Sequence, residues 1–440
     1  MIKMRFILLS HLLLGVASAA SFSNHANLIK RDNSQVCSDL TVSSNNGDRK
    51  VAIVIDSSGS MVSNDYTDLR IAAGRALNEF LISDSEAKDG KKADEVTVID
   101  FDDEAYLDYP LGDPGNANSS FSKIDSIGGT YITSGVLMAI DQLTSSNSGT
   151  TDKRSAIVVF TDGEDYSTDE LVSAIGNATA LGIRVSFGFL DPYASSQPEE
   201  VLKAVRDSRG VYATITFAAG SQNFINYVLL NGLTYNDNPQ GYGSQLLAGL
   251  AETQFISGSD TVTLKYSAEK NERVNFTITT ITAGSLKAEV KMDGKSLGSD
   301  TISYYDAFID VQAPSSGEMQ LLVTADGAPK DSMFSVTTNS NVPIKNCTVG
   351  VSGSNHSGLS KGAKAGIGIG VTIGILGLLG GAGYFGYKHF FGPGSGNTTA
   401  PPAHGNTTSG PTPGNHSQPP TYVDSIPWAN TRCIQEPSNQ

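Results

Sequence analysis

The stretch VAIVIDSSGSM, at residues 51–61, carries the most informative pattern in this chain of 440 residues. Its first five residues are apolar and mostly β-branched, which predicts a buried strand. Asp56, Ser58 and Ser60 follow that strand directly. Taken alone, the DSSGS segment also fits a Ser/Gly turn whose aspartate caps a helix.

Two further segments supply polar residues of the same kind. Thr130 lies in IGGTYITSGV at residues 127–136, and Asp162 follows the apolar run of AIVVFTDGED at residues 156–165. Because the carboxyl ends of parallel strands meet at one edge of a sheet, these side chains are expected to converge. Hydroxyl and carboxylate oxygens suit Mg²⁺, Mn²⁺ or Ca²⁺, whereas Zn²⁺ prefers His or Cys. The sequence therefore predicts one divalent-cation site, with Mg²⁺ as the first choice.

These three motifs, in this order and context, resemble those of the von Willebrand factor A domain, also called the integrin I domain. The resemblance implies a metal-ion-dependent adhesion site, in which the cation leaves one position for an acidic group of a partner. It also assigns roles: the hydroxyls of Ser58 and Ser60 bind the ion, Thr130 binds directly or through water, and Asp56 and Asp162 bind through water. Tyr131 is bulkier than this pattern leads us to expect, and Thr133 is an alternative to Thr130.

The sequence around the motifs predicts an α/β domain over residues 48–235, with a doubly wound, mostly parallel sheet and helices on both faces. Helical stripes begin near Leu69, Ile132 and Leu171, and a closing helix is expected around Phe224. Further strands are expected at 96–101, 185–190 and 211–217. Acidic residues after two of these strands are interpreted as a solvated loop rim, with a second cation site as the alternative: Asp100, Asp102, Asp103, Glu104 and Asp191.

A second segment, residues 255–345, shows alternating apolar residues and turn signals at Asp293-Gly294 and Asp326-Gly327. This pattern predicts a β-sandwich of some six to eight strands, whose default role is that of a spacer or structural partner. Cys37 and Cys347 flank both predicted domains and would lie in an oxidising compartment, which favours one disulfide between them. Pairing of either cysteine between two chains remains open, and Cys433 is expected to stay reduced.

The N-terminal residues predict secretion. Residues 1–20 have the charge, apolar run and small residues of a signal peptide cleaved after Ala19 or Ala20. Residues 21–47 form an extension, in which Lys30-Arg31 is a candidate processing site that would release a propeptide ending at 31. An unprocessed, flexible basic pair is the alternative.

After a juxtamembrane linker at 346–364, residues 365–387 carry no charge and are long enough to span a bilayer as a helix. This predicts a single-pass type I protein of the plasma membrane or cell surface, with its N-terminal domains outside. Glycines at four-residue intervals, such as Gly366, Gly370 and Gly374, are compatible with a homodimer through this helix or with glycine-rich composition alone.

The tail at residues 388–440, rich in Pro, Gly and Asn, is expected to be disordered and cytoplasmic. It contains Pro419, Pro420 and Tyr422, a PPxY pattern that WW domains bind. Outside the membrane, five sequons are candidate glycosylation sites: Asn118, Asn177, Asn275, Asn346 and Asn355.

Composition narrows the function. The net charge of −15 and pI of about 4.8 argue against binding to nucleic acid or to anionic lipid. We find no motif of a hydrolase or nucleotide-binding enzyme and no histidine within 48–235, so no enzymatic activity is predicted. Three hypotheses remain: a cell-surface adhesion or receptor module that binds an acidic partner through the metal, a structural surface or cell-wall protein with a stabilising metal, and a trafficking or regulatory protein that acts through its PPxY tail.

Overall fold

The computed structural model describes residues 35–42, 45–88, 90–145, 149–191, 194–216, 220–241, 243–302, 306–345 and 347–351. The predicted signal peptide, the dibasic site, the segment 365–387, the tail with its PPxY pattern, and the sequons Asn346 and Asn355 lie outside the described residues. Among the described residues, none of the helices is long and apolar enough to span a membrane.

Five parallel strands form the centre of the first domain, in the spatial order β3-β2-β5-β6-β7. Their bounds are β2 Lys50–Asp56, β3 Glu95–Phe101, β5 Ser155–Thr161, β6 Ile183–Leu190 and β7 Tyr212–Ile215. Every residue of β2, β5 and β6 is buried, because helices cover both faces of the sheet. A further strand, β4 (Ala105–Gly112), adds antiparallel to β3 and makes the sheet mixed.

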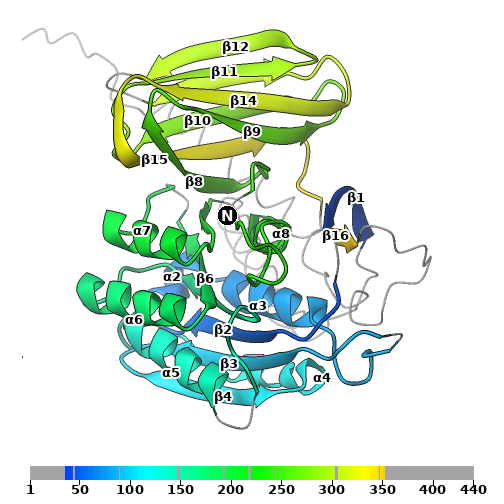
Figure 1. The fold of residues 1–440 in the computed structure, drawn as a ribbon, viewed down its shortest axis with the longest axis vertical. Helices are drawn as coiled ribbons and strands as arrows, with labels where there is room; N and C mark the ends of the chain where they lie inside the picture. The colour runs from blue at the N-terminus through cyan, green and yellow to red at the C-terminus, as the bar shows by residue number, and fades with distance from the viewer. Residues whose placement is uncertain are drawn as a thin grey trace, which may run out of the picture. The chain divides into compact units, whose positions relative to one another are not determined.

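Alternate residues of the central strand enter different cores. Val51, Ile53 and Ile55 pack with α3 (Leu69–Phe80) and α8 (Gly220–Leu230) on one face. Ala52 and Val54 pack on the other face with the second group of helices, α5 (Ile132–Thr144), α6 (Thr168–Ala180) and α7 (Glu199–Asp207). Figure 1 shows these two helical layers. Three shorter helices lie in the connections between the elements: α2 (Met61–Asn64), α4 (Pro114–Ala117) and η1 (Ser120–Ser122). The predicted doubly wound α/β architecture is therefore confirmed.

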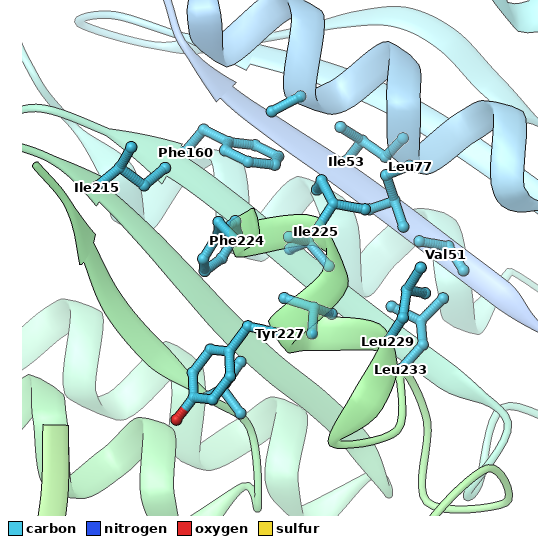
Figure 2. Packing of buried hydrophobic residues seen from close by; sticks show 14 of the residues in the cluster. Val51, Ile53, Leu77, Phe160, Ile215, Phe224, Ile225, Tyr227, Leu229 and Leu233 are labelled. Atoms are coloured by element: carbon cyan, nitrogen blue, oxygen red, sulfur yellow. The ribbon is translucent and has the colours of Figure 1, made fainter. Parts of the chain in front are cut away.

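Helix α8 is buried on all sides, and only Leu230 at its end is partly exposed. Phe224 packs edge-on against Phe160 of β5, with ring centroids 5.5 Å apart. A Cβ atom on Gly188 of β6 would stand 2.8 Å from the Phe224 ring, so glycine makes room for this ring. Figure 2 shows Phe224 and its neighbour Ile225 within this core.

The second segment folds as the predicted β-sandwich. One of its sheets has the order β12-β11-β14-β9, with all pairs antiparallel. The other half consists of β13-β10-β15-β8, also antiparallel. The bounds are β8 Leu250–Gly258, β9 Thr261–Ala268, β10 Arg273–Thr280, β11 Leu286–Met292, β12 Lys295–Ile302, β13 Ala307–Gln312, β14 Gly317–Ala325 and β15 Ala328–Ser340. One apolar core fills the space between the two sheets.

The two domains share one sheet, which the sequence does not indicate. β8 pairs antiparallel with β7, so ten described strands form a continuous hydrogen-bonded sheet from β13 to β4. The sandwich thus begins at Leu250, before the predicted start at 255. This pairing covers the edge of β7, which would otherwise present unpaired backbone groups.

The disulfide predicted between Cys37 and Cys347 is present, with Cα atoms 5.3 Å apart. It joins β1 (Gln35–Val42) to β16 (Cys347–Val351) in a separate parallel pair. Asn226 of α8 donates a hydrogen bond of 3.0 Å to the carbonyl of Cys347. The disulfide therefore connects the start and end of the folded region beside α8.

Of the described sequons, Asn118 and Asn177 have exposed side chains, and Asn275 of β10 is half-buried. None of the three is enclosed in a core, so glycosylation at these positions stays a prediction.

Glu252 of β8 leads to a prediction about stability and pH. Its side chain is 1% exposed, Oε1 accepts the Leu247 backbone N–H at 2.9 Å, and the Tyr227 hydroxyl also interacts with the carboxyl group. Burial raises the pKa of Glu252 well above its usual value. Because the pKa of Glu252 is higher in the folded than in the unfolded state, its carboxyl group contributes stability at pH values below its unfolded-state pKa. This contribution is lost as the pH rises toward its folded-state pKa.

Glu252→Gln removes this titration. The melting temperature of the variant minus that of the parent should therefore increase from pH 5 to pH 8. A gain of about 1 kcal/mol at pH 8 would raise the melting temperature by about 1–2 °C. Calorimetric melting of both full-length chains across this range checks the expectation. A difference that stays constant with pH would show that Glu252 does not titrate as argued.

Candidate metal centre

Three loops meet at the carboxyl edge of the parallel strands. Asp56 is the last residue of β2, and Asp162 follows β5, which pairs with β2. Thr130 stands two residues before α5 begins at Ile132. The strand neighbours thus bring segments more than 100 residues apart to one place, as the sequence predicts.

A short hydrogen-bonded series links three of the predicted residues. The hydroxyl oxygens of Ser58 and Ser60 are 2.9 Å apart, and the Ser60 hydroxyl donates to Oδ1 of Asp162 at 2.7 Å. Asn64 of α2, which sequence reasoning missed, donates its side-chain amide to the other Asp162 oxygen at 2.8 Å. The serine and aspartate oxygens therefore lie within contact distance of one another at the edge of the sheet.

Asp56 lies beneath this series and is 0% exposed. Oδ1 accepts the backbone N–H of Ser58 at 2.7 Å, and Oδ2 accepts the Thr161 hydroxyl at 2.6 Å. Burial raises the pKa of Asp56 to about 6 against the opposing effect of these hydrogen bonds, and the charge of Asp162 adds a smaller increase. Asp56 therefore holds the Ser58 loop and supplies negative charge below the hydroxyls.

Thr130 lies against the loop that contains Asp162. A Cβ atom built on Gly163 would be 3.2 Å from the Thr130 hydroxyl oxygen. Thr133, the sequence alternative, is only 2% exposed, and its backbone N–H donates to Asp165 at 2.7 Å. The structure thus brings the Thr130 hydroxyl next to Gly163, which adjoins Asp162, whereas Thr133 is buried and contacts Asp165 in the same loop.

Two glycines permit the close approach of the loops. Gly128 has a φ of +79°, which favours glycine, and its carbonyl accepts the Gly59 N–H at 3.0 Å. A Cβ on Gly129 would stand 1.4 Å from the Tyr166 hydroxyl. The Gly-Gly pair before Thr130 is therefore required by the packing of the three loops.

Arg70 of α3 connects the loops from below, and no sequence signal singled it out. Its Nε donates to the Asp56 carbonyl at 2.6 Å, and one terminal nitrogen donates to the Asp125 carbonyl at 2.9 Å. The other terminal nitrogen pairs with Asp65 at 3.0 Å, and neither side chain is exposed. The guanidinium thus fixes the loop of Ser58 relative to the loop of Thr130.

In the part of the chain that the structure describes, the additional acidic residues do not come together in a group of three His, Cys, Asp or Glu side chains that could hold a metal ion. Asp103 and Glu104 are exposed, as predicted for a solvated rim. Asp100 and Asp102 are buried instead, and Asp100 accepts the Ser57 hydroxyl at 2.6 Å. Asp191 accepts the backbone N–H of Ser195 at 2.9 Å.

The residues present fit a divalent cation. Ser58, Ser60, Thr130 and Asp162 offer hard oxygen donors, and Asp56 supplies charge behind them. Such a cation would remain electron-poor, because its nearest protein groups are mostly neutral hydroxyls. This arrangement defines the class as an α/β domain with an oxygen-lined cation site at the carboxyl edge of its sheet.

Comparisons with known proteins agree with this class. Residues 51–164 match the family model described as von Willebrand factor type A domain. No match was found among the curated proteins.

Three solved structures that are similar to part of this chain come from different organisms. An aerotolerance-related membrane protein of Bacteroides fragilis is 22% identical, with 41% of this chain and 98% of that chain covered and a TM-score of 0.32. Proximal thread matrix protein 1 of the mussel byssus is 13% identical over 44% of this chain and 48% of that one, with a TM-score of 0.34. The pilus adhesin SpaC of Lactobacillus rhamnosus GG is 12% identical over 68% and 40%, with a TM-score of 0.32.

Proposed function

We propose that this protein is a non-enzymatic binding module that captures an acidic group of a protein or matrix partner through a divalent cation. The observation that carries the proposal is the contact series from Ser58 through Ser60 to Asp162. When bound there, the cation would supply a coordination position for an oxygen ligand from outside. Mg²⁺ is the proposed ion, because hydroxyl and carboxylate oxygens suit it, with Mn²⁺ and Ca²⁺ as alternatives.

The chain's own residues support binding rather than catalysis. The described residues contain no histidine, and the carboxylates at the site are already engaged by hydrogen bonds. Hydrolysis would require a positioned general base near a reacting water. We therefore assign Asp56 a charge-supplying role, and Asp162 both orients the Ser60 hydroxyl and offers an oxygen donor to the cation.

The cell surface is the proposed location, with residues 365–387 as the anchor and the tail inside the cell. Surface labelling of intact cells, with one epitope placed between residues 31 and 35 and another after residue 388, tests this topology. Labelling of the C-terminal epitope without permeabilisation would contradict it.

Ser60→Ala and Asp162→Ala should each weaken Mg²⁺ binding on the order of 100-fold, because each removes an oxygen donor from the site. In the parent, Mg²⁺ at 100 times its dissociation constant should stabilise the fold by about 2.7 kcal/mol. Melting of the full-length chain with Mg²⁺ or a chelator measures this shift. Ser173→Ala, an exposed serine on α6, is the matched control and should keep it.

The same variants distinguish a binding role from a structural one. Capture of material from intact surfaces of the source cells should require Mg²⁺ and should be lost in Asp162→Ala. If Mg²⁺ raises the melting temperature but capture is equal in parent and variant, the cation only stabilises the fold and the binding proposal fails.

A further inference from the structure

Four large apolar side chains with exposed surfaces stand in the loops of the metal centre, and we refer to them as the rim. The rim consists of Val62 (65% exposed), Tyr66 (76%), Ile127 (61%) and Tyr166 (65%). Burying such side chains is the usual outcome of folding, and exposed apolar groups that gather in one place often mark an interaction surface. The rim therefore requires an explanation that the cation alone does not give.

Each rim residue is tied to the metal centre by its own loop. Val62 lies in α2, between Ser60 and Asn64, both of which bind Asp162. Tyr66 follows Asn64 by two residues. The backbone N–H of Ile127 donates to the Ser57 carbonyl at 2.8 Å, three residues before Thr130. The four side chains thus project from the same loops that carry the candidate ligands.

Tyr166 is held in place although it is exposed. Its hydroxyl donates to Asp103 at 2.8 Å above Gly129, and its ring stacks on Tyr131 with centroids 6.2 Å apart. The Tyr131 hydroxyl in turn donates to Glu170 at 2.9 Å. A partner would therefore meet an aromatic surface that is already ordered, which lowers the entropy cost of binding.

The charge around the rim has one sign. The segments 56–68, 101–104, 125–131 and 161–170 contain no lysine or arginine. Arg70, which contacts these loops, is buried and paired with Asp65. Asp56, Asp65 and Asp102 in these segments are buried, and the acidic residues with exposed side chains are Asp68, Asp103, Glu104, Asp125, Glu164, Asp169 and Glu170.

The negative charge of these four segments limits the kind of partner that can bind more than the cation does. A carboxylate that reaches the cation is attracted, but any further carboxylate beside it would face the acidic loops and be repelled. Lysine or arginine beside the first carboxylate would instead meet opposite charge, and could also stack on the faces of Tyr66 and Tyr166. Apolar side chains of the partner would cover Val62 and Ile127.

We propose that the ligand is a basic protein segment, with a single carboxylate for the cation, neighbouring lysine or arginine, and at least one apolar side chain against the rim. This inference rests on the proposed function, because the cation places the carboxylate. It goes further by assigning specificity to the rim and to the acidic loops.

A random-peptide display selection on the purified full-length chain in Mg²⁺, eluted with chelator, tests the proposal. The eluted peptides should share one Asp or Glu, a nearby Lys or Arg, and an aromatic or aliphatic residue. A synthetic copy of the leading peptide should bind about tenfold more weakly to Tyr66→Ala and to Tyr166→Ala. Its binding should also weaken with rising NaCl, because the charges are exposed.

Charge reversal provides the second arm. Glu104→Lys combined with Glu164→Lys should weaken this peptide severalfold and flatten its salt dependence, since both residues are exposed in the acidic loops. Leu181→Ala is the matched control for the two tyrosine variants of the rim. Asp141→Lys combined with Asp207→Lys is the matched control for the charge reversal. All three residues are exposed and lie outside these four segments. These controls should bind the peptide as the parent does.

Calorimetric Mg²⁺ titration of every variant separates the possible failures. Suppose that Mg²⁺ binds but that chelator elutes no peptide, or elutes only peptides with several carboxylates and no Lys or Arg. Either result overturns the basic-segment proposal while the cation site stands. The same conclusion follows if chelator releases only glycans in a parallel glycan array. Unchanged peptide affinity in the rim variants also overturns that proposal. If the parent binds no Mg²⁺, the proposed function fails first and this inference falls with it.

Discussion

Replacing Arg70 with alanine is expected to lower the free energy of unfolding by about 3–5 kcal/mol, because Asp65 would remain buried without its partner. The same change removes the hydrogen bonds to the Asp56 and Asp125 carbonyls, so the two loops lose their common support. Mg²⁺ affinity should therefore fall as well, although Arg70 contributes no oxygen donor. Denaturant unfolding of the full-length chain measures the first effect, and calorimetric titration of Mg²⁺ measures the second.

Arg75→Ala is the matched control for this prediction. Arg75 lies on the same helix, donates to the Ser122 hydroxyl at 3.0 Å and stands over the Phe121 ring, but it contacts neither metal loop. Its loss should cost about 1 kcal/mol or less and leave Mg²⁺ affinity unchanged. Equal effects of the two arginine variants would refute the role assigned to Arg70.

The double variant Cys37→Ser with Cys347→Ser is expected to lose about 2–5 kcal/mol of stability. The disulfide closes a loop with a sequence separation of 310, and a long loop gives a large stabilisation in the chain-entropy account. The parent treated with reductant should melt like the double variant. Melting curves with and without reductant make this comparison.

Cys433→Ser is the control, since this cysteine has no part in the pair and its loss should leave melting unchanged. Titration of thiols in the unfolded, non-reduced parent should find one free cysteine. Three free thiols, or a disulfide-linked dimer of two chains, would contradict the pairing.

The sequence predicts the centre of this fold well for a physical reason. Strands such as β2 and β5 are buried on both faces, so their apolar runs are continuous and unambiguous. The helices that cover them show a helical period and a recognisable cap: the Ser167 side chain accepts the Glu170 N–H. The candidate site follows from these elements, because the strand order places Asp56 and Asp162 at one edge.

What the sequence does not predict depends on long-range contacts. β4 mixes half-buried and exposed residues, so it gives no strong period. The β7–β8 pairing is decided by an uncovered strand edge rather than by a local pattern. Arg70 and Asn64 act through partners that are distant in the sequence or lie in another loop, and a polar residue on a helix carries no local sign of such a contact.

Calorimetric titration of Mg²⁺ into the full-length chain, repeated with Asp162→Ala, is the decisive experiment for the candidate cation site. We predict uptake of one ion per chain by the parent and loss of that uptake in the variant. No uptake by the parent, or equal uptake by parent and variant, would contradict the claim that the oxygens of these loops form a cation site.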